Sequence, residues 1–208
     1  MIAILDYGVG NLFSLCSSFR AIGAEAVVTA ERDVIRRADR LILPGVGAFE
    51  DAARKLRASG LDLLLKEEIE KGKPLLGICL GMQLLFERSH EYGIHEGLGL
   101  IPGDIVPFSS YLSSDYKIPH IGWNSIYPKK DFPLFKHVKA GDHVYFVHSF
   151  FAPADTAETA AEAEYGIRFT AAVAKGNVFG CQFHPEKSGG VGLSILRGFC
   201  EAEGGKVC

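Results

Sequence analysis

Cys79 stands between two glycines in the segment Gly77-Ile78-Cys79-Leu80-Gly81, where an apolar strand-like run gives way to a helical pattern. A nucleophile on so tight a turn needs small neighbours, because the backbone crowds it; the serine version is the G-x-S-x-G elbow. The turn would lift the sulfur clear of a sheet. The positive end of the following helix favours the thiolate, which is the form that attacks carbonyl carbons. The alternative is a structural cysteine packed between glycines.

A cysteine nucleophile needs a base, and His184 in Gln182-Phe183-His184-Pro185-Glu186 has the setting for one. The proline biases the residue before it toward an extended conformation, in which residues two apart lie on the same face. Glu186 could then reach the His184 ring and fix its tautomer, which completes a triad with Cys79. His148, in a strand-like run, is the competing base, and a surface histidine beside a solvated glutamate is the plain alternative.

Two backbone N–H groups are candidates for holding the oxyanion that forms when a thiolate attacks an amide carbonyl. Leu80 N–H is the first after the nucleophile, and Val46 N–H lies in Pro44-Gly45-Val46-Gly47, which closes another strand-like run. Ligands of open α/β sheets bind at the carboxyl ends of the strands, so we expect these groups to meet. The glycines around Val46 could let the loop flip and switch the oxyanion hole. The alternative is a loop that only turns the chain.

Three other chemistries have weaker support. Residues 7–13 begin like a dinucleotide-binding fingerprint, but Phe13 occupies the third glycine position, where close packing leaves no room for a side chain. No GxxxxGK[ST] segment is present for nucleoside triphosphates. Cys181 and His184 have the spacing of metal ligands, but no second pair accompanies them, so we expect no metal.

Short apolar runs alternate with helical patterns through the first half of the chain. The strand-like runs are 2–5, 26–29, 41–43 and 75–79, and the helical patterns are 12–22, 61–69 and about 82–88. Beyond residue 97 strand-like runs dominate, with a hairpin at Gly176-Asn177, until a closing helix near 193–200. Such alternation builds a parallel sheet covered on both faces. The predicted fold is therefore α/β and flavodoxin-like: an open, mixed, mainly parallel sheet with helices on both faces and antiparallel strands added in the second half.

Composition narrows the class of protein. The 208 residues are 48% hydrophobic and 23% charged, as in globular proteins, and we expect one domain over 1–208. The net charge of −3 has the wrong sign for a nucleic-acid-binding protein. No secretory leader and no apolar stretch of about 18 residues is visible, so we expect no membrane association. The cysteines are odd in number and form no CxxC pair, which suits a reduced, cytoplasmic protein.

Six segments carry a family resemblance: 6–11, 43–49, 77–86, 120–124, 145–150 and 182–188. On these segments the chain closely resembles the class I glutamine amidotransferases. The elbow and the His-Pro-Glu segment are shared across the class. The N-terminal segment, PGVG and His120-Ile121-Gly122-Trp123-Asn124 are similar, within the class, to the glutaminase subunits of imidazole glycerol phosphate synthases.

The resemblance implies a cysteine hydrolase of the glutamine side-chain amide that needs no cofactor. Cys79 would attack the carboxamide, His184 would protonate the departing ammonia, and Glu186 would hold and polarise the imidazole. Water activated by His184 would then release glutamate from a γ-glutamyl thioester. The resemblance also implies a set of contacts with L-glutamine, namely Gly47, Gln83, Glu91 and the backbone of Ser149 and Phe150.

A partner is implied as well. A cyclase subunit with a (β/α)8 barrel would form a heterodimer with the chain, receive ammonia through a tunnel, and make imidazole glycerol phosphate and AICAR. Asn11, Trp123 and Lys187 lie in motifs near the expected docking face. The family often has tyrosine where Phe150 and Phe151 stand here, which puts any contact through a tyrosine hydroxyl in doubt.

Alternative functions remain open at this point. The chain could serve another acceptor synthase of the class, although the PGVG and HIGWN segments count against this. It could be a catalytically silent, amidotransferase-like regulatory module, although Cys79, His184 and Glu186 are all intact. A plain flavodoxin-like binding protein would leave the elbow and the His-Pro-Glu segment as coincidence.

Overall fold

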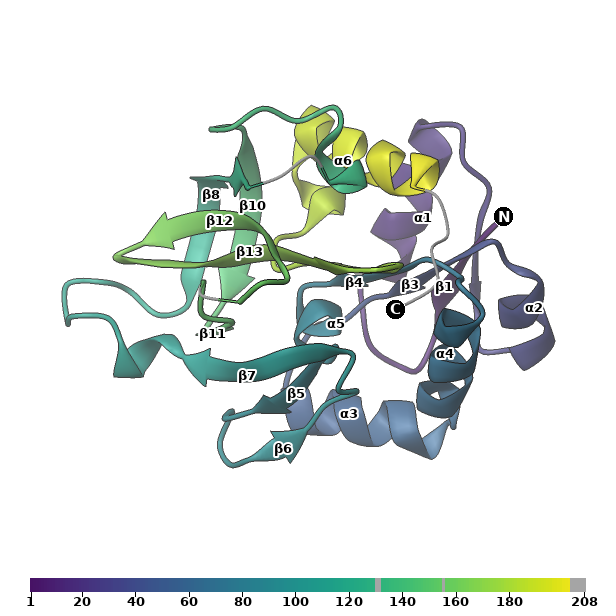
Figure 1. Ribbon diagram of the computed structural model, residues 1–208, viewed down its shortest axis with the longest axis horizontal. Helices are drawn as coiled ribbons and strands as arrows, with labels where there is room; N and C mark the ends of the chain where they lie inside the picture. The colour runs from purple at the N-terminus through teal and green to yellow at the C-terminus, as the bar shows by residue number, and fades with distance from the viewer. Residues whose placement is uncertain (130–131, 155, 203–208) are drawn as a thin grey trace.

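The computed structural model describes residues 1–129, 132–154 and 156–202, and its centre is a mixed eight-stranded sheet (Figure 1). The order is β2-β1-β3-β4-β14-β13-β12-β9. The parallel strands are β2 (Ala26–Thr29), β1 (Ile2–Leu5), β3 (Arg40–Leu43), β4 (Leu75–Ile78) and β14 (Val178–Cys181). The antiparallel additions are β13 (Ile167–Lys175), β12 (Thr159–Tyr165) and β9 (Tyr127–Pro128). This confirms the predicted fold class.

Helices cover both faces of this sheet because its parallel strands are apolar on both sides. Ile2 and Ile4 of β1 belong to one buried cluster, and Ala3 and Leu5 belong to the other. One face is covered by α1 (Leu12–Ala21) and α6 (Gly189–Glu201). The other is covered by α2 (Arg32–Arg37), α3 (Phe49–Ala58) and α4 (Leu61–Glu70) (Figure 1). The sequence pattern predicts α1, α4 and α6 but not α2 or α3.

Two smaller sheets stand beside the central one. Strand β10 (His143–His148) pairs antiparallel with β8 (His120–Ser125). The other sheet has the order β11-β7-β5-β6, formed by β11 (Phe150–Phe151), β7 (Ile101–Pro107), β5 (Phe86–Ser89) and β6 (His95–Glu96). The expectation that the strands beyond residue 97 add antiparallel to the central sheet is therefore right for β9, β12 and β13 and wrong for β7, β8, β10 and β11. A strand-like pattern does not say which edge the strand pairs with.

The expected helix over 82–88 is also wrong. The helix α5 (Leu80–Gln83) has four residues, and β5 begins soon afterwards at Phe86. Residues 80–86 are buried without interruption, so their apolar run has no period that separates helix from strand. The remaining elements are short 3-10 turns, namely η1 (Phe108–Ser110), η2 (Pro133–Phe135) and η3 (Pro185–Lys187).

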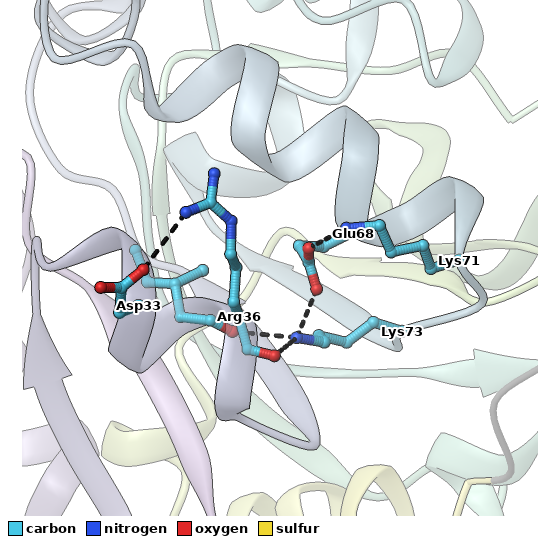
Figure 2. A network of polar contacts seen from close by, with 6 residues as sticks. Asp33, Arg36, Glu68, Lys71 and Lys73 are labelled. Carbon is cyan, nitrogen blue, oxygen red and sulfur yellow. Dashed lines mark hydrogen bonds and ion pairs between the residues drawn. The ribbon is translucent and has the colours of Figure 1, made fainter.

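A buried ion pair holds α2 and α4 together (Figure 2). The Glu68 side chain is 4% exposed, and its carboxylate oxygens lie 2.6 Å from the Nζ atoms of Lys71 and Lys73. Burial alone would raise the pKa of Glu68, but hydrogen bonds from the two lysines lower it below its usual value. Lys73 Nζ also donates to the carbonyls of Ile35 and Arg36 at the end of α2. One lysine therefore satisfies groups on both helices.

Candidate active site

Cys79 forms a strained elbow between β4 and α5. Its backbone has φ 55° and ψ −112°, a conformation that a side chain adopts at a cost of about 1–3 kcal/mol. Two hydrogen bonds hold it there. The Cys79 N–H donates to the Cys181 carbonyl over 2.7 Å, and the Cys79 carbonyl accepts from the Gln83 N–H over 3.1 Å. The turn places Cys79 at the carboxyl end of β4, as the glycine spacing predicts.

Close backbone contacts require the glycines around this elbow. A Cβ on Gly77 would lie 2.6 Å from the Gly81 carbonyl oxygen, and one on Gly81 would lie 1.9 Å from the Leu43 carbonyl oxygen. A Cβ on Gly45 would lie 2.6 Å from the Gly81 nitrogen. These separations are too short for a side chain, so the elbow packs directly against the loop that follows β3.

The surroundings of the sulfur differ from the sequence-based expectation. Helix α5 is a single turn, so it provides little of the helix dipole that the prediction relied on. Side chains approach the sulfur instead. His184 lines the same cavity as Cys79, and Gln182 Nε2 lies 3.8 Å from Cys79 Sγ. The Val147 carbonyl oxygen lies 3.9 Å from the same sulfur.

His184 and Glu186 lie where β14 leads into η3. His184 has extended backbone, and its Nδ1 is 2.9 Å from Glu186 Oε1, with both side chains buried. Burial of the ring disfavours its charged form, but the interactions with Cys79 and Glu186 outweigh this and raise the pKa of His184 to about 9. The ring is therefore protonated near neutral pH, with a proton available on the side of Cys79.

The competing base, His148, lines the same cavity but has both ring nitrogens in use. Its Nδ1 is 2.9 Å from the Phe150 carbonyl oxygen, and its Nε2 is 3.0 Å from His120 Nδ1. Burial lowers the pKa of His148 to about 3 and that of His120 to about 4. Because the ring is neutral and both nitrogens have partners, the geometry favours His184 over His148 as the base for Cys79.

A cavity of about 290 Å³ opens over Cys79 and His184. It is lined by every residue that the sequence analysis assigns to the oxyanion hole or to glutamine, namely Val46, Gly47, Leu80, Gln83, Glu91, Ser149 and Phe150. Tyr92, Pro119 and Val147 also line it, and no spacing in the sequence points to them. The Glu91 carboxylate accepts the Phe49 N–H at the start of α3, which fixes it at the cavity wall.

The loop that carries Val46 has two glycines with separate structural roles. Gly47 has φ +93°, which favours glycine, whereas Gly45 is required by its contact with the elbow. Val46 is 41% exposed at the rim of the cavity. Static backbone geometry therefore explains the presence of both glycines without any motion of the loop. The flip of this loop stays a prediction.

The 149–151 segment divides between the cavity and the core. The Phe150 carbonyl accepts from His148 and Gln83, so a backbone contact between Phe150 and substrate would use its N–H. The Ser149 carbonyl accepts an N–H from Phe108. Phe151 is buried and stacks on Phe108 with ring centroids 4.4 Å apart. The substitution of Tyr by Phe at 151 therefore lies in the core, while Phe150 faces the cavity.

The predicted docking residues lie on the surface. Trp123 is 56% exposed on β8 and packs edge-on to Tyr145, while Lys187 Nζ lies 5.7 Å from the centre of the Tyr145 ring. Asn11 occupies the N-cap position of α1, where its side chain makes no capping hydrogen bond within the described residues. Further exposed apolar side chains on α1 and β8 are Phe13 and Ile121.

Other features of the described residues carry no comparable chemistry. A larger hollow of about 940 Å³ is lined by residues within 128–129, 132–140, 174–179 and 201–202, and none of the predicted site residues lines it. Among residues 1–129, 132–154 and 156–202, no three His, Cys, Asp or Glu side chains gather as a metal site would require. Over the same part of the chain, none of the helices has the length and apolar character of a membrane span.

The sequence is similar to known proteins over almost its whole length. Residues 3–202 match the family described as "Glutamine amidotransferase class-I". The chain is 51% identical over 202 residues to the imidazole glycerol phosphate synthase subunit HisH of Caldanaerobacter subterraneus subsp. tengcongensis, covering 97% of this chain and 98% of the relative. It is 50% identical over 199 residues to the Bacillus cereus subunit of the same name, covering 96% and 93%.

Solved structures show the same fold at low sequence identity. A crystal structure of a glutamine amidotransferase superposes with a TM-score of 0.75 at 18% identity, covering 96% of this chain and 97% of that one. The structure of PurLQS from Thermotoga maritima gives 0.73 at 20% identity, also covering 96% and 97%. These similarities concern the fold alone.

Proposed function

The chain belongs to the class I glutamine amidotransferase family and functions as the glutaminase subunit of imidazole glycerol phosphate synthase in histidine biosynthesis; we propose that Cys79, His184 and Glu186 carry out its reaction. One observation carries the proposal. A strained cysteine faces a buried histidine that Glu186 holds, and both open on a cavity lined by all the predicted glutamine contacts.

The first half of the reaction forms a thioester. Protonated His184 stabilises the Cys79 thiolate, which attacks the carbon of the glutamine carboxamide. The carbonyl oxygen gains negative charge, and the N–H groups of Leu80 and Val46 hold it. As the C–N bond breaks, the His184 proton passes to the departing nitrogen, so ammonia leaves as a neutral molecule.

The second half hydrolyses the thioester. Once the sulfur is acylated it no longer carries negative charge, and one of the two groups that raise the pKa of His184 is lost. The neutral imidazole can then take a proton from water, which attacks the thioester carbon. Glutamate leaves, and Cys79 and His184 return to their charged pair. The change in charge on the sulfur thus switches His184 from acid to base.

The partner is the cyclase subunit, which uses the ammonia. Ammonia released into water is largely protonated near neutral pH and is then no longer a nucleophile, so direct transfer to the cyclase preserves its reactivity. The exposed side chains of Trp123 and Lys187 and the half-buried Asn11 form part of the docking face in this proposal, in which the cyclase covers the apolar side chains that β8 exposes. The enzyme works in the cytoplasm, as one domain over the whole chain.

The test is glutamate release from L-glutamine, measured with the purified chain alone and then with a cyclase subunit and its nucleotide ligand. We expect slow release by the chain alone and a steep rise with the liganded cyclase. Strong release by the chain alone would keep the glutaminase but remove the gating by the Val46 loop. No release in either state would contradict the proposal and favour another acceptor synthase or a silent module.

A further inference from the structure

A series of hydrogen bonds connects β8 to the sulfur of Cys79. It begins at the half-buried Asn124 and continues through four buried side chains, of which His120, His148 and Gln182 have no part in the proposed reaction and Gln83 also lines the cavity. From β8 to the centre, Asn124 Nδ2 lies 3.4 Å from His120 Nε2, His120 Nδ1 lies 3.0 Å from His148 Nε2, and His148 Nδ1 lies 2.9 Å from the Phe150 carbonyl oxygen. Gln83 Nε2 lies 3.0 Å from the same carbonyl oxygen and 3.0 Å from Gln182 Oε1. Gln182 Nε2 lies 3.8 Å from Cys79 Sγ.

The direction of each hydrogen bond follows from the Phe150 carbonyl, which can only accept. His148 must therefore carry its proton on Nδ1, and its bare Nε2 accepts from His120. On the other side, Gln83 must turn its NH₂ group to the carbonyl, and the second hydrogen of that group goes to Gln182 Oε1. Gln182 then has its NH₂ group on the side of Cys79.

The far end of the series fixes the same directions independently. The Ser125 N–H can only donate, and it bonds to Asn124 Oδ1 over 2.8 Å. The Glu164 carbonyl can only accept, and it bonds to Asn124 Nδ2 over 2.8 Å. Asn124 therefore presents an N–H to His120 Nε2, which leaves the His120 proton on Nδ1. Two separate anchors thus require the same tautomer of His120.

We propose that this series positions the nucleophile: it holds His120 and His148 as neutral Nδ1–H tautomers and aims an N–H of Gln182 at Cys79 Sγ. An N–H that points at sulfur stabilises the thiolate over the thiol. His120 and His148 are positioning residues, because they act on the sulfur only through the Phe150 carbonyl and the two glutamines. The inference rests on the proposed function only in taking Cys79 as the nucleophile.

The tautomers can be read directly by long-range proton–nitrogen NMR of the imidazole rings. We expect His120 and His148 to be neutral and protonated on Nδ1 at neutral pH, while His184 is an imidazolium. The His120→Phe variant identifies the His120 signals by their loss. A charged ring, or a proton on Nε2, at either His120 or His148 would overturn the proposal.

The effect on the sulfur is measured as the rate at which iodoacetamide alkylates Cys79, followed on the Cys79 peptide by mass spectrometry over a range of pH. Gln182→Glu keeps an acceptor for Gln83 but replaces the donor to sulfur with a second oxygen. Alkylation at neutral pH should fall on the order of tenfold and recover at higher pH. An unchanged profile would overturn the proposal.

Two substitutions of His120 separate positioning from packing, because the ring also stacks on Tyr165. His120→Phe keeps the ring and removes the donor to His148, whereas His120→Asn keeps a donor and loses the ring. If His120 acts by positioning, His120→Phe should slow Cys79 alkylation by about threefold, and His120→Asn should slow it less. A larger effect of His120→Asn would overturn the proposal. His143→Phe, an exposed histidine on β10, is the matched control. The NMR and alkylation experiments need neither glutamine nor the cyclase. Failure of the glutaminase assay and failure of this proposal are therefore distinguishable.

Discussion

Two histidines at the same cavity have opposite protonation because their hydrogen-bond partners differ. His184 faces Glu186 and Cys79, and its pKa is raised to about 9. His148 faces a backbone carbonyl and a neutral histidine, and burial lowers its pKa to about 3. The sequence predicts both as candidate bases, His184 because Glu186 follows it by two residues and His148 because it lies in a strand-like run. Only the neighbours decide between them, and His120 lies too far along the chain for any local pattern to reveal it.

The role of Glu186 can be tested through the pH dependence of glutamine hydrolysis. Because His184 must be protonated when ammonia leaves, kcat/KM for the cyclase-bound enzyme should be high below pH 9 and fall as pH rises through about 9. Glu186→Gln removes a group that raises the His184 pKa, so the alkaline decline should move to lower pH. The rate should fall on the order of 10²-fold without vanishing. If kcat/KM of Glu186→Gln declined at the same alkaline pH as in the wild type, this account of Glu186 would be contradicted.

At the scale of elements, contacts between backbones form the site. The end of β3, the loop around Val46 and the first turn of α5 pack so closely that glycine is required on both sides. The Gly-x-Cys-x-Gly spacing predicts a tight turn at this point. It does not reveal that Gly81 touches the Leu43 carbonyl, because that contact joins segments far apart in sequence.

Gly81→Ala tests this contact. The added Cβ would lie 1.9 Å from the Leu43 carbonyl oxygen, which is backbone and cannot rotate away. We expect the free energy of unfolding to fall by about 3 kcal/mol or more in urea denaturation. Gly190→Ala in α6 is the control, since a Cβ there meets no atom within 4 Å, and alanine favours the helix. Equal stability of the two variants would contradict the close-packing argument.

Lys73→Met tests the connection between α2 and α4 shown in Figure 2. The change leaves the buried Glu68 carboxylate with only Lys71, whose side chain is 62% exposed, and it removes the donor to the α2 carbonyls. We expect a loss of about 2–3 kcal/mol in the free energy of unfolding at neutral pH. Lys71→Met should cost about 1 kcal/mol or less. Equal losses in the two variants would contradict the claim that the buried contacts of Lys73 stabilise the protein more than the exposed contact of Lys71.

At the scale of the whole molecule, the cavity lies where separate sheets meet. The strands β1 to β4 and the helices α1 and α4 could be predicted from their apolar patterns, whereas α2 and α3 could not. The elbow and the His184 segment lie at strand ends. The second half could not be predicted, since β10 and β8 form a sheet of their own. That sheet supplies His120, which the sequence-based site lacks, and His148, which the sequence indicates only as a competing base, because the sequence leaves the pairing of these strands undetermined.

The most direct test of the central claim compares two nitrogen sources in the complex of this chain with the cyclase subunit. With Cys79→Ala, formation of imidazole glycerol phosphate from glutamine should fall by at least about 10³-fold, because no thioester can form. Formation from added ammonium salt should stay within about twofold of the wild-type complex, because that reaction occurs on the cyclase. Glutamine-dependent synthesis that survives the substitution would show that Cys79 is not the nucleophile.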